Sequence, residues 1–326
     1  MNKLISCRSF IEYNESIGHL YIPDLFVRIM HENGGYFLKT NNRGFRSDTD
    51  FKIQKGDKIK RVMVFGDSFT AGDGVENSQR YSDLLQANIR DIEVLNFGLS
   101  HSGTDQQYLI FKEIAKEMKP DLIIISPLLE NIRRNMKSEL LNQTQDGQFF
   151  FRSKPYFEIQ ESELKLCNIP VPKTKLFNSE TIPAEEHSKL RIVLSSIKKF
   201  FYKNLKIKAN IFPEYDSENR IEWRVMKAIL TKWVNELDCP VILMPIPWYL
   251  QFEHPDKYVT ENYIQRFNSL KFNRECDMIN LLEEFQKYDL DMRRSFTYKY
   301  DKHFSPAGHI AVAESLIPIV KSSLKK

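Results

Sequence analysis

A serine, a histidine and an aspartate occupy two short segments that could together carry out acyl transfer. Residues 61–75 read RVMVFGDSFTAGDGV, an apolar run that stops at Gly66, Asp67 and Ser68. Near the other end of the chain, YDKHFSPAGH (300–309) contains Asp301 and His303. A serine hydroxyl becomes a useful nucleophile when a base removes its proton, and that base is usually a histidine oriented by an acid. The two segments hold the groups that such a serine needs.

The spacing of Asp301 and His303 fits an acid and its histidine. On an extended segment, side chains two residues apart point to the same side, so the acid could reach one imidazole nitrogen while the other faces a third group. Ser305 and Pro306 are typical of a helix start, which would anchor the segment. Taken alone, the pair has a plainer interpretation as surface residues before a helix. The catalytic interpretation requires that residues 61–75 and 300–309 lie next to each other in the folded chain.

The elements that would position these groups alternate between strand and helix. Short apolar runs rich in β-branched residues lie at 61–67, 92–98, 120–129, 240–247 and 276–281. Helical patterns lie at 77–90, 104–119, 222–237 and 305–324. The run at 120–129 is apolar at nearly every position, as expected for a strand buried on both faces. This alternation predicts an α/β fold with a central parallel sheet covered by helices on both faces.

Several polar or small residues follow directly after these predicted strands. Ser68, Gly98, Glu130 and Asn131 each stand just past the end of a run. In open α/β sheets, reactive groups gather beyond the carboxyl ends of the strands. We therefore expect these residues to lie along one edge of the sheet.

The chain divides into an arm, a core and an insertion. We expect an N-terminal arm at 1–60 packed on the core, a core formed by 61–136 and 218–326, and an insertion at 137–217. An insertion at this sheet edge would lie over the strand ends as a lid or substrate wall. Its aromatic residues suit a carbohydrate or an acyl group equally, and they are Phe149, Phe150, Phe151, Tyr156 and Phe157.

Composition excludes several classes of protein. The net charge is +4, from 47 basic and 43 acidic residues, which gives no footprint for nucleic acid. The basic and aromatic stretch at 198–208 is interpreted as a solvated helix face. The cysteines are widely spaced and predict neither a disulfide framework nor a metal site. Without a secretory signal or an apolar run of the ~20 residues that span a membrane, we expect a soluble, cytoplasmic protein.

Together the motifs resemble those of the SGNH/GDSL hydrolases. VFGDSFTAGDGV is similar to the nucleophile segment of that family, LNFGLSHSGTDQQ (95–107) to its second signature, and DKHFSPAGH to its last. NNRGFRSD (41–48) resembles the arm that precedes the nucleophile in a carbohydrate-esterase-like branch. The resemblance covers about 41–136 and the last helices, but not the insertion. It implies a three-layer, flavodoxin-like fold, with neither a cofactor nor a metal.

The resemblance also implies a role for particular residues. Ser68 would be the nucleophile, His303 the base and Asp301 the acid. Backbone N–H groups of Ser68 and Gly98 would stabilise the oxyanion, although Gly98 could equally be a simple turn glycine. Asp67 is expected to organise the turn beside the nucleophile through backbone N–H groups.

The third signature departs from the family pattern. Where the family has Gly-x-Asn-Asp after the third strand, this chain reads SPLLENIRRN (126–135). In one register Glu130 takes the place of the oxyanion amide, where a carboxylate would repel the oxyanion. In the other, Asn131 is the donor. His101 is expected to line the substrate pocket, and Glu130 and Asp67 are further candidates for pocket-lining residues.

The leading hypothesis is a serine esterase that cleaves acyl esters, with acetyl esters of a carbohydrate favoured. A sugar hydroxyl in place of water would make the same site an O-acetyltransferase. The altered signature at Glu130 and Asn131 supports a second class, an inactive glycan-binding protein with the same fold. A phosphate-binding loop at GDSFTAGDG is disfavoured, because no lysine follows it and its aspartates would repel phosphate. We expect a small-molecule or glycan ester as substrate and no nucleic-acid partner.

Overall fold

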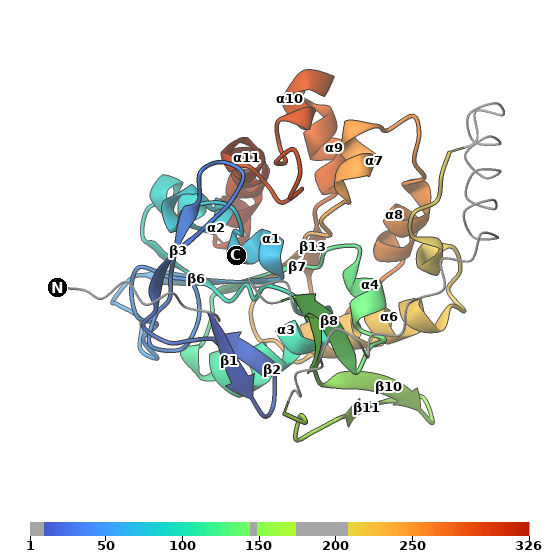
Figure 1. The fold of residues 1–326 in the computed structure, drawn as a ribbon, viewed down its shortest axis with the longest axis horizontal. Coiled ribbons are helices and arrows are strands. Elements are labelled where there is room, and N and C mark those ends of the chain that lie inside the picture. The colour runs from blue at the N-terminus through green and yellow to red at the C-terminus, as the bar shows by residue number, and fades with distance from the viewer. Residues whose placement is uncertain (1–9, 144–148, 174–207, 326) are drawn as a thin grey trace.

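The fold is built on a five-stranded parallel sheet in the order β13-β12-β7-β5-β6 (Figure 1). The computed structural model describes residues 10–143, 149–173 and 208–325. The sheet strands are β5 (Lys60–Gly66), β6 (Ile92–Asn96), β7 (Leu122–Ser126), β12 (Val241–Leu243) and β13 (Cys276–Met278). In chain order these are the first to fifth strands, so the order across the sheet is 2-1-3-4-5. That order is the flavodoxin-like one, which confirms the predicted fold class.

Helices cover both faces of the sheet, which gives three layers (Figure 1). One face carries α2 (Tyr81–Asn88), α9 (Leu281–Gln286) and α11 (Pro306–Ser323), and the other carries α3 (Thr104–Ile110) and α6 (Ile221–Asn235). The other helices of the described residues are α1 (Ser68–Ala71), α4 (Asn131–Arg134), α7 (Tyr249–Glu253), α8 (Glu261–Asn268) and α10 (Leu290–Arg294), with 3-10 turns at Asn77–Gln79, Lys116–Met118 and Pro213–Tyr215. The helical pattern at 104–119 is divided, because α3 continues as a π-helical turn at Phe111–Ala115.

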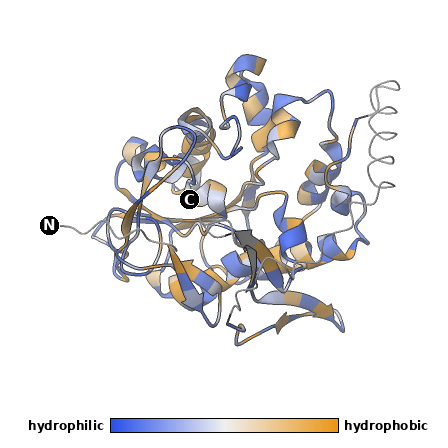
Figure 2. Cartoon of the chain, viewed as in Figure 1, coloured by the Kyte–Doolittle hydropathy of each residue, from blue (hydrophilic) through white to orange (hydrophobic). Residues whose placement is uncertain are grey.

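The core lies between the sheet and its helices. Every residue of β7 is buried, as predicted for a strand covered on both faces. Phe65 of β5 stacks on Phe97 with ring centroids 5.0 Å apart, and it meets the edge of Trp233 of α6 at 5.2 Å. The outer helices mix hydrophobic and hydrophilic residues (Figure 2), and α6 buries both of its tryptophans. In the described ranges no helix is long and apolar enough to cross a membrane.

Short antiparallel pairs of strands flank the sheet. The N-terminal residues form two of them, β1 (Ile11–Asn14) with β2 (Gly18–Tyr21) and β3 (Phe26–Ile29) with β4 (Tyr36–Lys39). Residues 137–217 contribute β8 (Glu139–Gln143) with β9 (Phe149–Ser153) and β10 (Tyr156–Gln160) with β11 (Glu163–Cys167). The boundaries at 60, 136 and 217 stay predictions.

The insertion is tied to the core by a buried ion pair and by packing. Lys154, between β9 and β10, donates to the buried Asp105 of α3. Phe157 of β10 is buried against Tyr108 of α3, with ring centroids 5.9 Å apart. Phe157 therefore belongs to the core and does not form part of an exposed substrate wall. Much of the expected wall, including residues 144–148 and 174–207, lies outside the described residues.

Candidate active site

The candidate nucleophile stands at the carboxyl end of the first strand of the sheet. Gly66 ends β5, and the side chain of Asp67 caps α1 by accepting the Phe69 N–H at 3.1 Å. Ser68 is the first residue of α1 and is 6% exposed. A β-carbon at Gly66 would lie 1.9 Å from Thr70 Oγ1, so this tight turn requires glycine. The turn lies between β5 and β7, where the strand order reverses and ligands bind in such sheets.

The structure brings Ser68, His303 and Asp301 into one chain of hydrogen bonds. His303 Nε2 lies 2.8 Å from Ser68 Oγ, and His303 Nδ1 lies 2.6 Å from Asp301 Oδ2. Lys302, between acid and histidine, has a φ of 64°. The segment is thus kinked rather than extended, yet both side chains still meet. This arrangement has the order and distances of a nucleophile, a base and an orienting acid.

The groups around the hydrogen bonds of Ser68, His303 and Asp301 raise the pKa of His303 and lower that of Asp301. Burial opposes the charged form of the His303 ring, but its hydrogen bond to Asp301 and the charge of Asp73 outweigh burial and raise its pKa. Burial likewise opposes charge on Asp301, yet the hydrogen bonds from His303 and His31 lower the pKa of Asp301 to about 2. An acid that stays ionised can stabilise the imidazolium formed when the histidine takes a proton.

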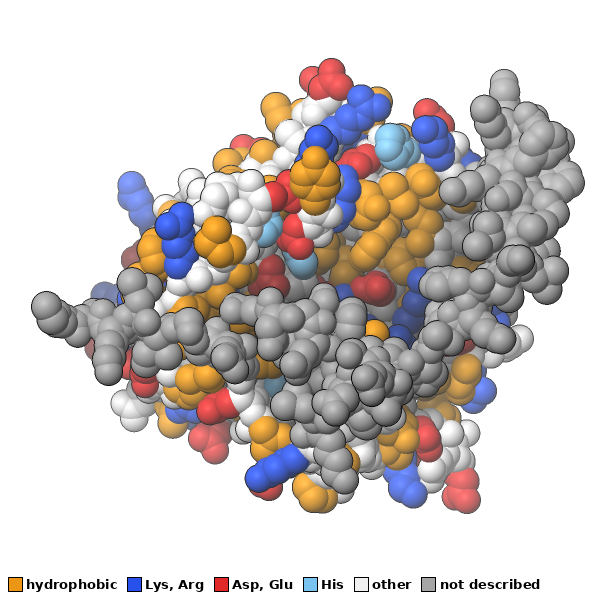
Figure 3. All heavy atoms as spheres, in the orientation of Figure 1, with side chains coloured by type: hydrophobic (Ala, Val, Ile, Leu, Met, Phe, Trp, Pro, Cys, Tyr) orange, Lys and Arg blue, Asp and Glu red, His pale blue; other side chains and the backbone are white. Residues whose placement is uncertain are grey.

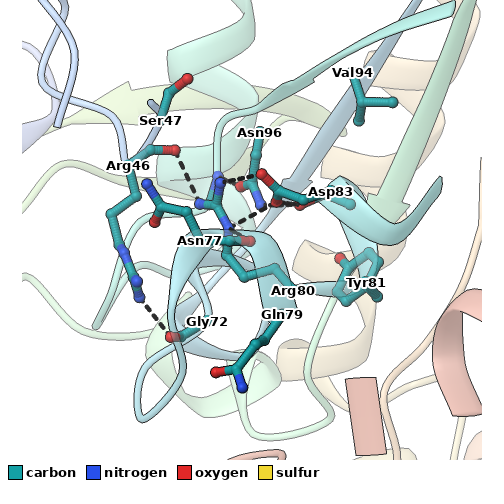
Figure 4. A network of polar contacts seen from close by, with 12 residues as sticks. Arg46, Ser47, Gly72, Asn77, Gln79, Arg80, Tyr81, Asp83, Val94 and Asn96 are labelled. Atoms are coloured by element: carbon teal, nitrogen blue, oxygen red, sulfur yellow. Dashed lines mark hydrogen bonds and ion pairs between the residues drawn. The ribbon is translucent and has the colours of Figure 1, made fainter. Parts of the chain in front are cut away.

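Two buried arginines support the far end of the nucleophile turn (Figure 4). Arg46 Nη1 donates to the Gly72 carbonyl at 2.5 Å, and its Nη2 donates to the Val75 carbonyl at 2.7 Å. Arg80 Nη1 in turn donates to the Arg46 carbonyl at 2.9 Å. Arg46 belongs to the segment NNRGFRSD (41–48). That segment therefore fixes the loop that follows Ser68 to the N-terminal arm.

Gly98 is a glycine because the nucleophile helix packs directly against it. A β-carbon at Gly98 would lie 2.3 Å from the Ala71 nitrogen and 2.6 Å from the Thr70 carbonyl carbon. The Gly98 N–H donates to Asn96 Oδ1 at 2.8 Å, while Asn96 Nδ2 donates to the Thr70 carbonyl at 2.7 Å. The expected oxyanion donor is thus already engaged. Gly98 is also not among the positive-φ glycines of the described chain, so it is no left-handed turn residue.

The turn after Gly98 offers a different backbone donor, which the sequence interpretation missed. His101 has a φ of 65°, and within the described residues its backbone N–H has no hydrogen-bond partner. The turn docks on the end of β5, because the Leu99 N–H donates to the Gly66 carbonyl at 3.1 Å. The His101 ring is exposed, close enough to His303 for their charges to interact. A positive φ at a histidine leaves no mark in the sequence.

An arginine links the nucleophile turn to the altered third signature. Arg134 Nη1 lies 3.1 Å from Asp67 Oδ2, and Arg134 Nη2 lies 2.5 Å from Glu130 Oε2. Burial raises the pKa of Asp67 to about 6, although Arg134 and the Phe69 N–H act in the opposite direction. The Glu130 carboxylate is therefore paired with a cation. The ion pair with Arg134 reduces the repulsion that the Glu130 carboxylate would exert on a nearby oxyanion.

Asn131 is the first residue of α4 and is fully buried. Among the described residues its side-chain Oδ1 and Nδ2 have no hydrogen-bond partner. Buried polar groups are rarely left unpaired without a reason. Asn131 thus keeps an amide donor available, whereas Glu130 is held by Arg134. Whether that amide serves an oxyanion stays a prediction.

Histidine and acidic side chains gather near the centre of one face of the molecule (Figure 3). In the described part of the chain, no three His, Cys, Asp or Glu side chains are grouped as they would be to hold a metal ion. The chemistry available at this face is that of a hydroxyl, an imidazole and carboxylates.

The order of the sheet and the position of its Gly-Asp-Ser turn define the class of fold. The chain has a flavodoxin-like α/β fold, with five parallel strands and the Gly-Asp-Ser turn directly after the first of them, as the resemblance to the SGNH/GDSL hydrolases predicted. No family model matches the sequence, and no curated protein matches it.

Solved structures with similar folds include several esterases and lipases. A member of the lipolytic protein G-D-S-L family from Veillonella parvula is 10% identical, with a TM-score of 0.41 over 80% of this chain and 98% of its own. A catalytic mutant of an acetylxylan esterase from Geobacillus stearothermophilus is 14% identical, with a TM-score of 0.44 over 81% of this chain and 95% of its own. A two-domain esterase active on acetylated mannans is 9% identical, with a TM-score of 0.41 over 82% of this chain and 50% of its own.

Proposed function

We propose that the protein is a serine hydrolase that cleaves acyl esters through an acyl-enzyme on Ser68. The observation that carries the proposal is the hydrogen-bond chain from Ser68 Oγ through His303 to Asp301. Ser68 Oγ attacks the ester carbonyl carbon while His303 Nε2 takes the hydroxyl proton. Collapse of the tetrahedral intermediate breaks the bond to the leaving alcohol, which receives that proton from His303. Water then attacks the acyl-enzyme by the same route and restores Ser68.

The oxyanion formed in each half-reaction requires fixed donors. We assign the backbone N–H groups of Ser68 and His101 to this role, with the Asn131 amide as the third donor. All three come from segments that follow carboxyl ends of the sheet strands β5, β6 and β7. Gly98 supports the site by allowing α1 to approach, since its own N–H is engaged by Asn96. Removing one such donor typically lowers the rate by roughly 10²–10³.

A carbohydrate carrying acetyl groups is the substrate class that we favour. The sequence resemblance to a carbohydrate-esterase-like branch supports it, and so does an aromatic surface beside the triad. Lys302 directly precedes His303 in the sequence, and its Nζ lies 4.6 Å from the centroid of the Tyr249 ring. Trp248 lies 5.5 Å from Tyr249, centroid to centroid, and both rings are half-buried. Half-buried aromatic rings offer apolar surface, which suits the apolar face of a sugar ring.

Hydrolysis of p-nitrophenyl acetate tests the nucleophile. Wild type should release p-nitrophenol, and Ser68→Ala should reduce that release to the background rate. Ser315→Ala is the matched control, because this serine lies on α11 and, among the described residues, its hydroxyl bonds only to the Ala311 carbonyl of the same helix. Equal turnover by wild type and Ser68→Ala would refute the assignment.

The same assay separates an esterase from its alternatives. Adding a sugar acceptor should leave the release of acetate unchanged if water is the second nucleophile. Loss of acetate release with appearance of acetylated sugar would identify an O-acetyltransferase instead. A wild-type protein that binds an acetylated glycan but turns over no ester would be the inactive glycan-binding protein.

A further inference from the structure

The turn between β3 and β4 is hydrogen-bonded to the loop that carries Asp301. The Glu32 carboxylate accepts three consecutive backbone N–H groups, from Lys299 at 3.1 Å, Tyr300 at 2.9 Å and Asp301 at 2.8 Å. Hydrogen bonds to a charged acceptor are among the stronger ones in proteins. This turn, which comes from the N-terminal arm, therefore fixes the backbone at the position of Asp301.

His31 of the same turn contacts the triad carboxylate itself. His31 Nε2 lies 3.1 Å from Asp301 Oδ2, the oxygen that also lies 2.6 Å from His303 Nδ1. The other ring nitrogen, His31 Nδ1, lies 3.0 Å from Asn33 Oδ1. The His31 side chain is 9% exposed, so water can do little to replace these partners.

The amide of Asn33 is oriented by its other contacts. Its Oδ1 accepts the Gly35 N–H at 3.0 Å, and its Nδ2 donates to the Gly74 carbonyl at 3.0 Å. Nδ2 also donates to the Tyr298 hydroxyl at 2.9 Å, while that hydroxyl donates to the Gly74 carbonyl at 2.8 Å. A flipped amide would place an acceptor against a carbonyl. Asn33 therefore presents an acceptor to His31.

Both ring nitrogens of His31 consequently face acceptors. Nδ1 faces the Asn33 carbonyl oxygen and Nε2 faces a carboxylate. A neutral imidazole carries one N–H and one lone pair, so one of these contacts would be repulsive. An imidazolium donates through both nitrogens and satisfies both contacts. The geometry requires a positively charged His31.

The groups around His31 include the carboxylates of Asp301 and Glu32, which favour a positive charge, and the cation Arg46 behind the Tyr36 ring. Gly74 permits the close approach, because a β-carbon there would lie 3.2 Å from His31 Nε2. The aromatic rings next to it belong to Tyr298, at 4.4 Å, and Tyr36, at 6.0 Å, between centroids. The titratable and charged groups that face His31 or stand just behind these rings are Asp301, Glu32, Tyr298, Tyr36, His303, Asp73 and Arg46.

We propose that His31 is a positioning residue of the active site, which in its doubly protonated form shares Asp301 Oδ2 with His303 and holds the acid in place. The proposal deepens the proposed hydrolase function and rests on it.

Two substitutions separate the charge of His31 from its hydrogen bond. His31→Gln keeps an N–H donor near the place of Nε2 but carries no charge. It should retain kcat within several-fold of wild type, because the amide still donates to Asp301. His31→Ala removes the donor and should lower kcat by roughly 10- to 100-fold with little change in KM, because it misplaces the acid without touching substrate. His254→Gln is the control, since its ring makes no hydrogen bond to the triad, and it should match wild type.

Nitrogen-15 NMR of the histidine rings gives a readout that does not depend on activity. At pH 7 the His31 ring, assigned by its absence in His31→Gln, should show two protonated nitrogens in wild type and in Ser68→Ala. A neutral His31 ring, or a wild-type kcat in His31→Ala, would overturn the proposal while leaving the hydrolase function intact. If wild type shows no turnover or labelling of Ser68, the proposed function fails, and the NMR spectrum still decides whether His31 is charged.

Discussion

Replacing Asp67 by asparagine should change how stability depends on pH. Asp67 is fully buried, and burial raises its pKa to about 6 from an ordinary value of 3.8, despite the opposing charge of Arg134. The folded chain therefore holds a proton on this carboxyl at pH values where the unfolded chain has lost it. Its contribution to stability is fully present below pH 3.8 and is lost as the pH rises to about 6.

The size of the effect follows from the two pKa values. A tenfold difference in proton affinity corresponds to about 1.4 kcal/mol, so a pKa of about 6 against 3.8 corresponds to about 3 kcal/mol. Asparagine does not titrate and is an equally good N-cap residue for α1. The substitution also removes the ion pair with Arg134, and a contribution from that pair that does not vary with pH cancels when two pH values are compared. The unfolding free energy of Asp67→Asn minus that of wild type should thus rise by about 2.4 kcal/mol between pH 4 and pH 7, most of the full effect.

Urea unfolding at a series of pH values measures this difference. The m-value should stay equal in both proteins, so that the midpoint alone reports stability. Asp291→Asn is the control, because Asp291 lies on the surface of α10 with its side chain 94% exposed and should give a curve parallel to wild type. A parallel curve for Asp67→Asn would refute the reasoning, since it would mean that the buried carboxyl has an ordinary pKa.

Three further predictions concern catalysis. Asp301→Asn should lower kcat by roughly 10³–10⁴, because the amide no longer holds His303 in the required tautomer, and steady-state kinetics would exclude this role if kcat stayed within tenfold. Gly98→Ala should destabilise the fold by about 1–3 kcal/mol and lower kcat by roughly 10², since its β-carbon would push against Ala71; wild-type urea midpoint and kcat would contradict it. The acid limb of kcat/KM should have its midpoint above 6.5, because His303 must be neutral to act as a base and its pKa is raised. A midpoint of the acid limb at or below pH 6.5 would contradict the assignment of His303 as the base.

The fold was predictable because its strands carry strong and local signals. The run that became β7 is apolar at nearly every position and buried on both faces, which is characteristic of a central parallel strand. The helix start at Ser305 and Pro306 was predictable for the same kind of reason, since the Ser305 hydroxyl accepts the Gly308 N–H at 3.4 Å. The extent of each element was less predictable. The helical pattern at 104–119 did not indicate the π-helical turn that follows α3.

The convergence of Ser68, Asp301 and His303 was predictable because their chemistry is particular to their side chains. Ser68, Asp301 and His303 converge as the motifs indicated, although no sequence pattern showed the kink at Lys302. The oxyanion donors that we propose were harder to predict, because backbone N–H groups have no residue type. The N–H of Gly98 is bonded to Asn96, a contact visible only in three dimensions.

The neighbours of the triad could not be derived from sequence at all. The residues around His31 read as an ordinary turn, and 270 positions separate His31 from Asp301. The pairing of Glu130 with Arg134 follows helix spacing, but the approach of Arg134 to Asp67 depends on the packing of α4 against the nucleophile turn. Long-range polar contacts of this kind arise from tertiary structure, which local patterns do not encode.

Labelling with a fluorophosphonate probe tests the nucleophile most directly. The probe phosphonylates a serine only when a working base activates it, so peptide mass mapping of the labelled chain identifies the nucleophile itself. The account predicts that wild type carries the label on Ser68, that Ser68→Ala carries none, and that His303→Ala is labelled much more slowly. A label on another serine, or a folded wild-type protein that takes up no label, would contradict it.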